Sequence, residues 1–458
     1  NDILPQDAID QMTVITGGLP AKFGDATGGI VSVTTRGISS LTRAGIEVIS
    51  SNLTDPYNYN LVSFNASGPI LRKKDESKTP IIGYLITGEY NFAKDWDPSA
   101  TSIPVLNQDY QDNLNLNPLE FEGIPNYLDF QTVSSNNMSE YTTAENWELQ
   151  DVKPNSNRDE IKLQGKLDFR LGKNINFTVG GSFSNMQRMS PSWRRSLFNN
   201  DYNYEQIFNN LNAFARVQHK LSDDDATGSL KNVFYTLQAG YSLNNYILHD
   251  PRLGDNFFEY GYVGKFNPTT NYQYDQNPFG FETKDIRVIQ ENGDTIFETH
   301  TGAILQEYVT YDFEAGSQNP IMANYTQQYI DYFHSYLPDL DPSRDHIIFG
   351  GGMINGDVVP SGYSIFYYPG TLASTYWDEK DSRIQFSGSA SADIGNHALE
   401  FGFEYERQRR DFYSVVGNQL WTLGRQYANQ HLQNKVYFID DALQNQYNEN
   451  FLIFSSEY

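Results

Sequence analysis

The sequence predicts an all-β protein, and three observations favour that class. Aromatic residues, which are enriched in β-strands, make up 14% of the 458 residues. Several segments alternate strictly between apolar and polar residues, which is the period of a strand with two different faces. No stretch approaches the roughly 18 uninterrupted apolar residues of a membrane-spanning helix. A membrane β-barrel and a soluble antiparallel sandwich both fit these observations.

The clearest alternation covers residues 161–171, where apolar residues take the odd positions and polar residues the even ones. After a glycine-containing turn at 172–174 the alternation resumes over 175–184, so the two segments predict a hairpin. We find no convincing long amphipathic helix. Similar segments bring the total to about nine candidate strands: 44–50, 57–67, 81–91, 211–218, 233–244, 384–394 and 399–406.

The connections between these strands alternate between short and long. Tight turns join the predicted hairpins, whereas polar and aromatic stretches of about 92–158, 188–209 and 247–380 separate them. This asymmetry is typical of the short periplasmic turns and long extracellular loops of an outer-membrane barrel. In such a barrel the charged residues of the polar strand face would line the lumen, namely Lys162, Lys166, Asp168, Arg170, Glu400, Glu404 and Glu406.

Composition excludes several function classes. With 57 acidic and 32 basic residues the formal net charge is −25, which argues against nucleic-acid binding. The absence of cysteine excludes disulfide scaffolds, thiolate metal sites and cysteine nucleophiles. The sequence contains no HExxH metal signature, no Gly-x-Ser-x-Gly elbow and no phosphate-binding loop. We therefore predict no catalytic residues, no enzyme activity and no cofactor.

One short string suggests a metal site. Asp339, Asp341, Ser343 and Asp345 place oxygen ligands at alternate positions, as hard cations such as calcium prefer. The string lacks the glycine at its sixth position and the glutamate at its twelfth that complete a calcium loop. A solvated loop is the alternative interpretation.

The long connections also contain aromatic and basic residues with two interpretations each. Exposed aromatic side chains on loops predict ligand binding, although folding of the loops explains them equally well. The basic clusters at 193–195 and 407–410 are predicted to contact lipopolysaccharide phosphates or loop carboxylates. The aromatic residues in question are Trp96, Trp147, Tyr260, Tyr262, Tyr272, Tyr329, Tyr332 and Tyr336.

Residues 9–37 carry a family resemblance. They contain a strand, a glycine pair, an aromatic-glycine pair, a second glycine pair and a β-branched strand that ends in Thr-Thr-Arg. This ordered set resembles the end of the plug domain of TonB-dependent outer-membrane receptors. The residue sequence of the segment is similar to that of receptors of the Bacteroidetes type. The matching positions are Gly17, Gly18, Phe23, Gly24, Gly28, Gly29, Thr34, Thr35 and Arg36.

The resemblance implies the end of a plug at residues 1–37 and strands of a transmembrane antiparallel β-barrel at residues 38–458. The family's barrel is of the 22-stranded type, so this chain is expected to be an incomplete receptor. The implied function is import of a bulky nutrient, such as an oligosaccharide, a peptide or a metal chelate, across the bacterial outer membrane. The alternative is a receptor-like barrel that serves as a structural or docking subunit of an outer-membrane assembly.

The resemblance also implies partners. These are outer-membrane lipid and lipopolysaccharide, and a TonB-type energising protein that would bind a segment upstream of Asn1. A SusD-like lipoprotein or a larger outer-membrane complex is a further expected partner, although residues 26–29 differ from the SusC-like form of the motif. A soluble carbohydrate-binding module is the third interpretation of the chain.

Overall fold

The computed structural model describes residues 4–5, 9–16, 29–35, 40–74, 79–172, 174–221, 230–275, 282–289, 295–302, 304–362 and 365–434. The chain forms two compact units. The first, here called the sheet unit, comprises Asn1–Val105, Trp147–Asp255 and Thr375–Val415. The second, here called the insertion unit, comprises Leu106–Asn146, Asn256–Ser374 and Val416–Tyr458.

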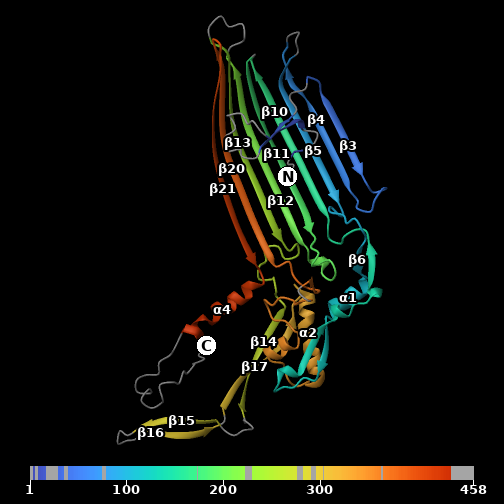
Figure 1. The fold of residues 1–458 in the computed structure, drawn as a ribbon, viewed down its shortest axis with the longest axis vertical. Helices are drawn as coiled ribbons and strands as arrows, with labels where there is room; N and C mark the ends of the chain where they lie inside the picture. Colours follow the sequence, from blue (N-terminus) through green and yellow to red (C-terminus); the bar gives the residue numbers. More distant parts are fainter. Residues whose placement is uncertain are drawn as a thin grey trace. The chain divides into compact units, whose positions relative to one another are not determined.

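The sheet unit contains one large antiparallel sheet. In the described part of the chain the sheet has nine strands in the order β21-β20-β13-β12-β11-β10-β5-β4-β3, so that β3 and β21 are its two edges (Figure 1). These strands are β3 (Arg43–Ser50), β4 (Asn60–Arg72), β5 (Pro80–Ala93), β10 (Arg158–Leu171), β11 (Ile175–Ser190), β12 (Tyr204–Lys220), β13 (Leu230–His249), β20 (Thr375–Ile394) and β21 (His397–Val416).

The fold class predicted from the sequence, all-β with an antiparallel sheet, is confirmed. Each of the nine strands overlaps one of the segments that show alternation in the sequence, and eight of them contain the whole segment, whereas β4 begins three residues after the start of 57–67. The hairpin predicted from 161–171 and 175–184 forms as β10 and β11, with Leu171 opposite Ile175 at the turn. Gly172 at that turn has φ +86°, a conformation that glycine adopts without strain.

The two faces of the sheet are inverted relative to a soluble protein. On β10 the polar residues Glu160 and Lys162 are only 7% and 8% exposed. Their apolar neighbours Ile161 and Leu163 are 42% and 44% exposed. We call the face that carries Lys162 the polar face and the face that carries Leu163 the apolar face.

The strand register continues the apolar face across neighbouring strands. Leu163 lies opposite Phe183 on β11, and Phe183 lies opposite Leu211 on β12. On the other side Leu163 lies opposite Gly88, where a Cβ would meet the ring of Phe64 at 2.2 Å. Phe64, Leu163, Phe183 and Leu211 are all exposed. Glycine at 88 therefore leaves room for the phenylalanine within a continuous apolar row.

The two ends of the sheet differ in their connections. Ala93 of β5, Arg158 of β10 and Arg188 of β11 lie side by side in the register at one end. The longer connections, 94–157, 191–203 and 250–374, all leave the sheet there. The opposite end carries shorter connections, including 172–174 and 395–396. The predicted asymmetry of connections is therefore present, and the strands extend further into the stretch 188–209 than the alternation indicated.

The N-terminal strands of the sheet unit form a separate hairpin. β1 (Ile9–Ile15) pairs antiparallel with β2 (Ile30–Thr35), and Met12 lies opposite Val33. Gly29, just before β2, has φ +137°, and a Cβ there would meet the Ile15 carbonyl oxygen at 2.9 Å. Only glycine fits this position without strain.

The insertion unit contains helices and short sheets. Its two-stranded sheets pair β7 with β8, β14 with β17, β15 with β16, and β18 with β19. Their bounds are β7 (Leu119–Gly123), β8 (Val133–Asn137), β14 (Gly264–Asp275), β15 (Glu282–Ile289), β16 (Thr295–Gly302), β17 (Ile304–Ala315), β18 (Ser361–Gly362) and β19 (Phe366–Tyr367). The helices are α1 (Gln108–Leu116), α2 (Pro320–Tyr336), α3 (Arg344–Phe349) and α4 (Gln419–Asn434). The short strands β6 (Ile103–Leu106) and β9 (Trp147–Gln150) pair with each other and lie almost entirely within the residues of the sheet unit.

The helix α2 corrects the expectation that the chain contains no long amphipathic helix. Its 17 residues bury one face, on which Tyr329 and Phe333 are 1% and 0% exposed. With Val133 and Ile347 they form the core of the insertion unit. The buried face is made largely of tyrosine, threonine, methionine and alanine, so it lacks the aliphatic stripe by which sequence analysis recognises such helices.

No helix in the described ranges has both the length and the apolar character needed to cross a membrane.

Candidate functional site

The polar face of the sheet is the candidate functional site. Because side chains alternate between faces along each strand, the register places polar residues of successive strands in transverse rows. The first row runs from Glu89 through Lys162, Ser184, Asn210 and Asn244 to Asp381. The next row runs from Thr87 through Gln164, Ser182, Asn212 and Ser242 to Arg383.

Ion pairs and hydrogen bonds connect the polar face. Lys162 Nζ lies 3.3 Å from Glu89 Oε1 and 3.6 Å from Glu160 Oε2. Further along β10, Lys166 Nζ lies 3.7 Å from Asp168 Oδ2, and Thr178 donates a 2.6 Å hydrogen bond to Asp168 Oδ1. Burying these charges requires such partners, because an unpaired charge away from water is costly.

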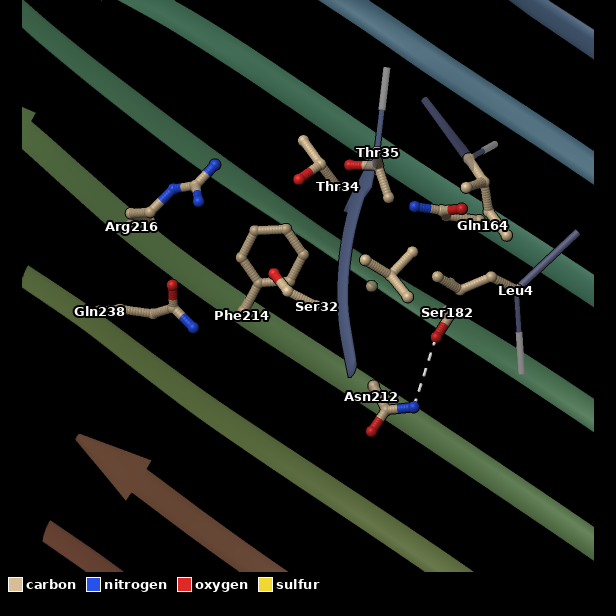
Figure 2. A pocket seen from close by; sticks show the side chains of 13 residues that line it. Leu4, Ser32, Thr34, Thr35, Gln164, Ser182, Asn212, Phe214, Arg216 and Gln238 are labelled. Carbon is tan, nitrogen blue, oxygen red and sulfur yellow. Dashed lines mark hydrogen bonds between the residues drawn. The ribbon is translucent and has the colours of Figure 1, made fainter. Parts of the chain in front are cut away.

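The β1–β2 hairpin lies against this polar face. Lys166 Nζ donates a 3.3 Å hydrogen bond to Thr35 Oγ1 at the end of β2. Between hairpin and sheet there is a cavity of about 590 Å³, within the usual volume range of ligand pockets. Figure 2 shows Ser32, Thr34 and Thr35 of β2 on one side of the cavity, and side chains from the sheet strands on the other.

Polar side chains line most of the sheet side of the cavity, together with the ring of Phe214. Asn212 donates a 3.4 Å hydrogen bond to Ser182, drawn as a dashed line in Figure 2. Gln164 Oε1 and Arg216 Nε are buried atoms with no hydrogen-bond partner among the residues that the structure describes. Since Gln164 is only 5% exposed, its carbonyl oxygen offers a ready acceptor to a molecule in the cavity.

The predicted plug motif is only partly visible. Gly29, Thr34 and Thr35 lie in or beside β2, and the last two line the cavity. The other motif positions, Gly17, Gly18, Phe23, Gly24, Gly28 and Arg36, lie outside the described residues. The two strands expected on either side of the glycines are present as β1 and β2.

The calcium-like string has other interactions in the insertion unit. The Ser343 side chain accepts a hydrogen bond from the His346 backbone N–H and caps α3. Asp341 Oδ1 lies 3.5 Å from His334 Nε2, and Asp345 Oδ1 lies 3.4 Å from Arg344 Nη1. In the described ranges no three acidic or histidine side chains, Asp339 included, lie close enough together to hold a metal ion. The calcium site stays a prediction.

The loop aromatics divide between folding and exposure. Tyr260 and Tyr329 are fully buried, so the expectation of exposed aromatic loops is wrong for them. Burial raises the pKa of the Tyr329 hydroxyl well above its usual range. Tyr336 is 47% exposed and packs edge-on against Tyr332. Trp147 lies edge-on to Phe198 in the sheet unit.

The two basic clusters differ from each other. Arg195 is buried, with its guanidinium 5.5 Å from the ring centroid of Tyr204. In the second cluster Arg409 and Arg410 pair with Asp411 and Glu379, each at 2.8 Å. Carboxylates on the sheet strands therefore satisfy these two arginines, rather than carboxylates on the loops.

The end of the sheet with the long connections carries an ion pair between a buried aspartate and a partly exposed arginine. Arg252 contacts both carboxylate oxygens of Asp250, at 2.9 and 2.6 Å, and Asp250 is 0% exposed. The Arg252 guanidinium lies 3.6 Å from the ring centroid of Tyr202. Burial raises the pKa of the Tyr202 hydroxyl, which therefore stays neutral beneath the arginine.

Sequence analysis missed the polar-face residues of β12 and β13 that line the cavity, including Asn212, Arg216 and Gln238. The signal was present, because all three take the even positions of alternating segments. It was the position of the hairpin that distinguished them from other polar strand residues. In contrast, Arg170 and Glu404 are exposed although their strands alternate as predicted.

No protein-family model and no curated protein matches the chain. Three similar solved structures are the siderophore receptor PiuA from Acinetobacter baumannii, the ferric citrate transporter FecA and the ferric enterobactin receptor PfeA from Pseudomonas aeruginosa. Sequence identities are 8%, 10% and 11%, and TM-scores are 0.30, 0.32 and 0.28. The matches cover 89%, 90% and 90% of this chain but 52%, 45% and 47% of those chains. The chain thus spans about half the length of these proteins.

Proposed function

We propose that this chain forms part of an outer-membrane β-barrel that imports a bulky nutrient in the manner of TonB-dependent receptors. The inverted sheet carries this proposal. A sheet that exposes leucine and phenylalanine on one face while it buries lysine and glutamate on the other is suited to lipid outside and a polar lumen inside. In water the same arrangement would expose a large apolar surface, which soluble proteins avoid.

The height of the apolar face fits a bilayer. On β10 the exposed apolar residues run from Ile161 to Leu171. The ten steps between these two residues, at about 3.4 Å each, span about 34 Å along the strand. With a tilt of about 40° this corresponds to a band of about 26 Å, close to the roughly 25 Å of outer-membrane barrels.

The edges of the sheet support a larger barrel. β3 and β21 each have one neighbouring strand among the described residues, and both are largely exposed. Long open edges leave backbone N–H and C=O groups unpaired, which lipid does not tolerate. In this proposal further strands pair with β3 and β21 and close a barrel of the 22-stranded type.

The hairpin supplies the plug in this proposal. Residues 1–37 would be the end of a plug domain and residues 38–458 barrel strands with long external connections. The cavity beside Thr34 and Thr35 and the hydrogen bond from Lys166 to Thr35 support a plug that rests on the lumen wall. A TonB-type protein would move the plug, and lipopolysaccharide, a SusD-like lipoprotein or a larger complex would be partners at the outer surface.

Membrane insertion and uptake are the experiments that test the proposal. The protein should fractionate with the outer membrane, require detergent for extraction and migrate faster on gels before heating than after it. Nutrient uptake by cells should then depend on a TonB-type protein. Membrane insertion without any uptake would support the alternative, a barrel that serves as a docking subunit. A protein that stays monomeric in water without detergent would contradict both.

A further inference from the structure

Two adjoining recesses on the polar face differ in the sign of their charge. One, of about 270 Å³, is lined by the cations Arg158, Lys162 and Arg188 together with Glu160. The other, of about 370 Å³, is lined by the acids Glu379 and Asp381. Phe208 and Asn210 line both recesses, so the two meet along β12.

The basic recess has an arginine that is held in place but not neutralised. Arg188 lies directly opposite Arg158 in the register, and like charges in that position repel each other. Its guanidinium lies 4.4 Å from the ring centroid of Trp96, and its Nε donates a 2.8 Å hydrogen bond to Gln206. Arg158 has a carboxylate partner in Glu160, at 2.7 Å, whereas the structure records none for Arg188 within the described ranges. A fixed guanidinium fork of this kind suits a carboxylate.

The acidic recess has the complementary feature. Asp381 accepts a hydrogen bond from Gln408 through Oδ2, while its Oδ1 is buried and has no partner among the described residues. Glu379, two residues away on the same face of β20, is paired with Arg410 at 2.8 Å. Arg410 also interacts electrostatically with Asp381, but Oδ1 of Asp381 is left as an acceptor for a cationic group.

The wall between the two charges has the chemistry of a peptide-binding surface. The rings of Phe208 and Tyr246 lie 4.8 Å apart and offer an apolar platform. Asn210 and Asn244 lie opposite each other in the register, and side-chain amides donate and accept hydrogen bonds as peptide groups do. Asn210 uses one N–H in a 3.0 Å hydrogen bond to Ser184, which fixes its orientation.

The spacing sets the length of the ligand. Arg188 and Asp381 are three strand spacings apart, about 14 Å, and four residues apart along the strand direction, about 13 Å. Their backbones are thus about 20 Å apart, and the arginine side chain shortens the gap. An extended chain covers about 3.3 Å per residue, so three to five residues bridge it.

We propose that the polar face binds a short linear peptide, with Arg188 at its carboxylate end and Asp381 at its ammonium end. This inference rests on the proposed function, because it names the class of nutrient that would enter the lumen. A single amino acid is too short to meet both charges, and a ligand of one charge sign would leave one recess unmatched.

Calorimetry on the full chain in detergent tests the inference with four probes: tetra-alanine, its N-acetylated form, its C-amidated form and the doubly blocked form. We expect tetra-alanine to bind, and each block to weaken binding about tenfold. Asp381→Asn should weaken the binding of tetra-alanine about tenfold. It should also remove the effect of acetylation, while the effect of amidation stays. Arg188→Gln should also weaken the binding of tetra-alanine about tenfold, but it should remove the effect of amidation while the effect of acetylation stays.

Two controls and two contrary outcomes complete the design. Arg170→Gln and Glu47→Gln, which change exposed charges on β10 and β3, should leave the affinity unchanged. The four probes test both charged ends of the peptide on the unaltered protein, so the test does not depend on the folding of a variant. A detergent-dependent, heat-modifiable protein that binds all four probes equally, or none, would overturn the peptide site and leave the proposed function standing. Loss of membrane insertion would instead contradict the proposed function.

Discussion

Lys166 of β10 and Thr35 of β2 are joined by a hydrogen bond of 3.3 Å from the lysine Nζ to the threonine Oγ1. The bond links the N-terminal hairpin to the polar face of the sheet. The two residues are 131 positions apart in the chain, so the contact reflects the fold rather than local structure. It is a direct physical link between the predicted plug segment and the predicted lumen wall.

Removing this link should loosen the hairpin. A hydrogen bond from a charged donor contributes about 1.5–3 kcal/mol. Lys166→Met should therefore raise the hydrogen-exchange rates of the β2 amides about tenfold or more, with little change in β11. Lys94→Met, which alters an exposed lysine of the same unit, is the control. Unchanged exchange in β2 would show that Lys166 does not hold the hairpin.

The apolar face should behave as a lipid-facing surface. Leu163→Arg should lower the free energy of unfolding in lipid vesicles by about 1–3 kcal/mol, somewhat less than arginine costs at the bilayer midplane, because Leu163 lies about three residues from the middle of the apolar band. Leu149→Arg changes a leucine of β9 that is 75% exposed and should stay within about 0.5 kcal/mol. Denaturant titration of the refolded protein measures both. If Leu163→Arg left the free energy of unfolding unchanged, this face would be in contact with water.

The insertion unit should have its own core. Phe333 is fully buried beside Tyr329, so Phe333→Ala should destabilise this unit by about 3–5 kcal/mol. Hydrogen exchange should then accelerate in α2 while β10 and β11 keep their protection. Leu340→Ala, at a side chain that is 37% exposed, serves as the reference substitution. Equal acceleration in both units would mean that they unfold together.

The ion pair between Asp250 and Arg252 should stabilise the connection between β13 and the residues that follow it. Asp250→Asn leaves the Arg252 guanidinium without its carboxylate. Since Arg252 is partly exposed, we expect a loss of about 2 kcal/mol in the free energy of unfolding. The exposed Asp255→Asn should have almost no effect. Thermal unfolding compares the two, and equal midpoints would contradict a structural role for the pair.

The sequence predicted the nine-stranded sheet well because alternation is a local property. On β10 polar residues take the even positions from Glu160 to Lys166, and the structure buries these while it exposes the odd positions from Ile161 to Leu167. The hairpin turn at Gly172 was equally local. Strand ends were less accurate, since β11 continues to Ser190 and β12 begins at Tyr204, where tyrosine, asparagine and glutamine blur the alternation.

The insertion unit and the cavity were not predictable in the same way. α2 buries Tyr325, Thr326 and Tyr329 against segments that lie far from it in the chain, and none of them marks an apolar stripe. The cavity depends on where β2 lies against β10 and β12, which no residue pattern encodes. Arg216 and Gln164 became candidate site residues only because the hairpin lies beside them.

The central claim is that the apolar face contacts lipid and the polar face an enclosed lumen. The chain has no cysteine, so single spin labels placed at positions 160 to 167 of β10 report each site without a background signal. Accessibility to oxygen, which concentrates in lipid, and to a water-soluble nickel complex should be measured for the protein in vesicles. We predict high oxygen accessibility at 161, 163 and 167 and low accessibility at 160, 162, 164 and 166. High accessibility of 161, 163 and 167 to the nickel complex would contradict the claim.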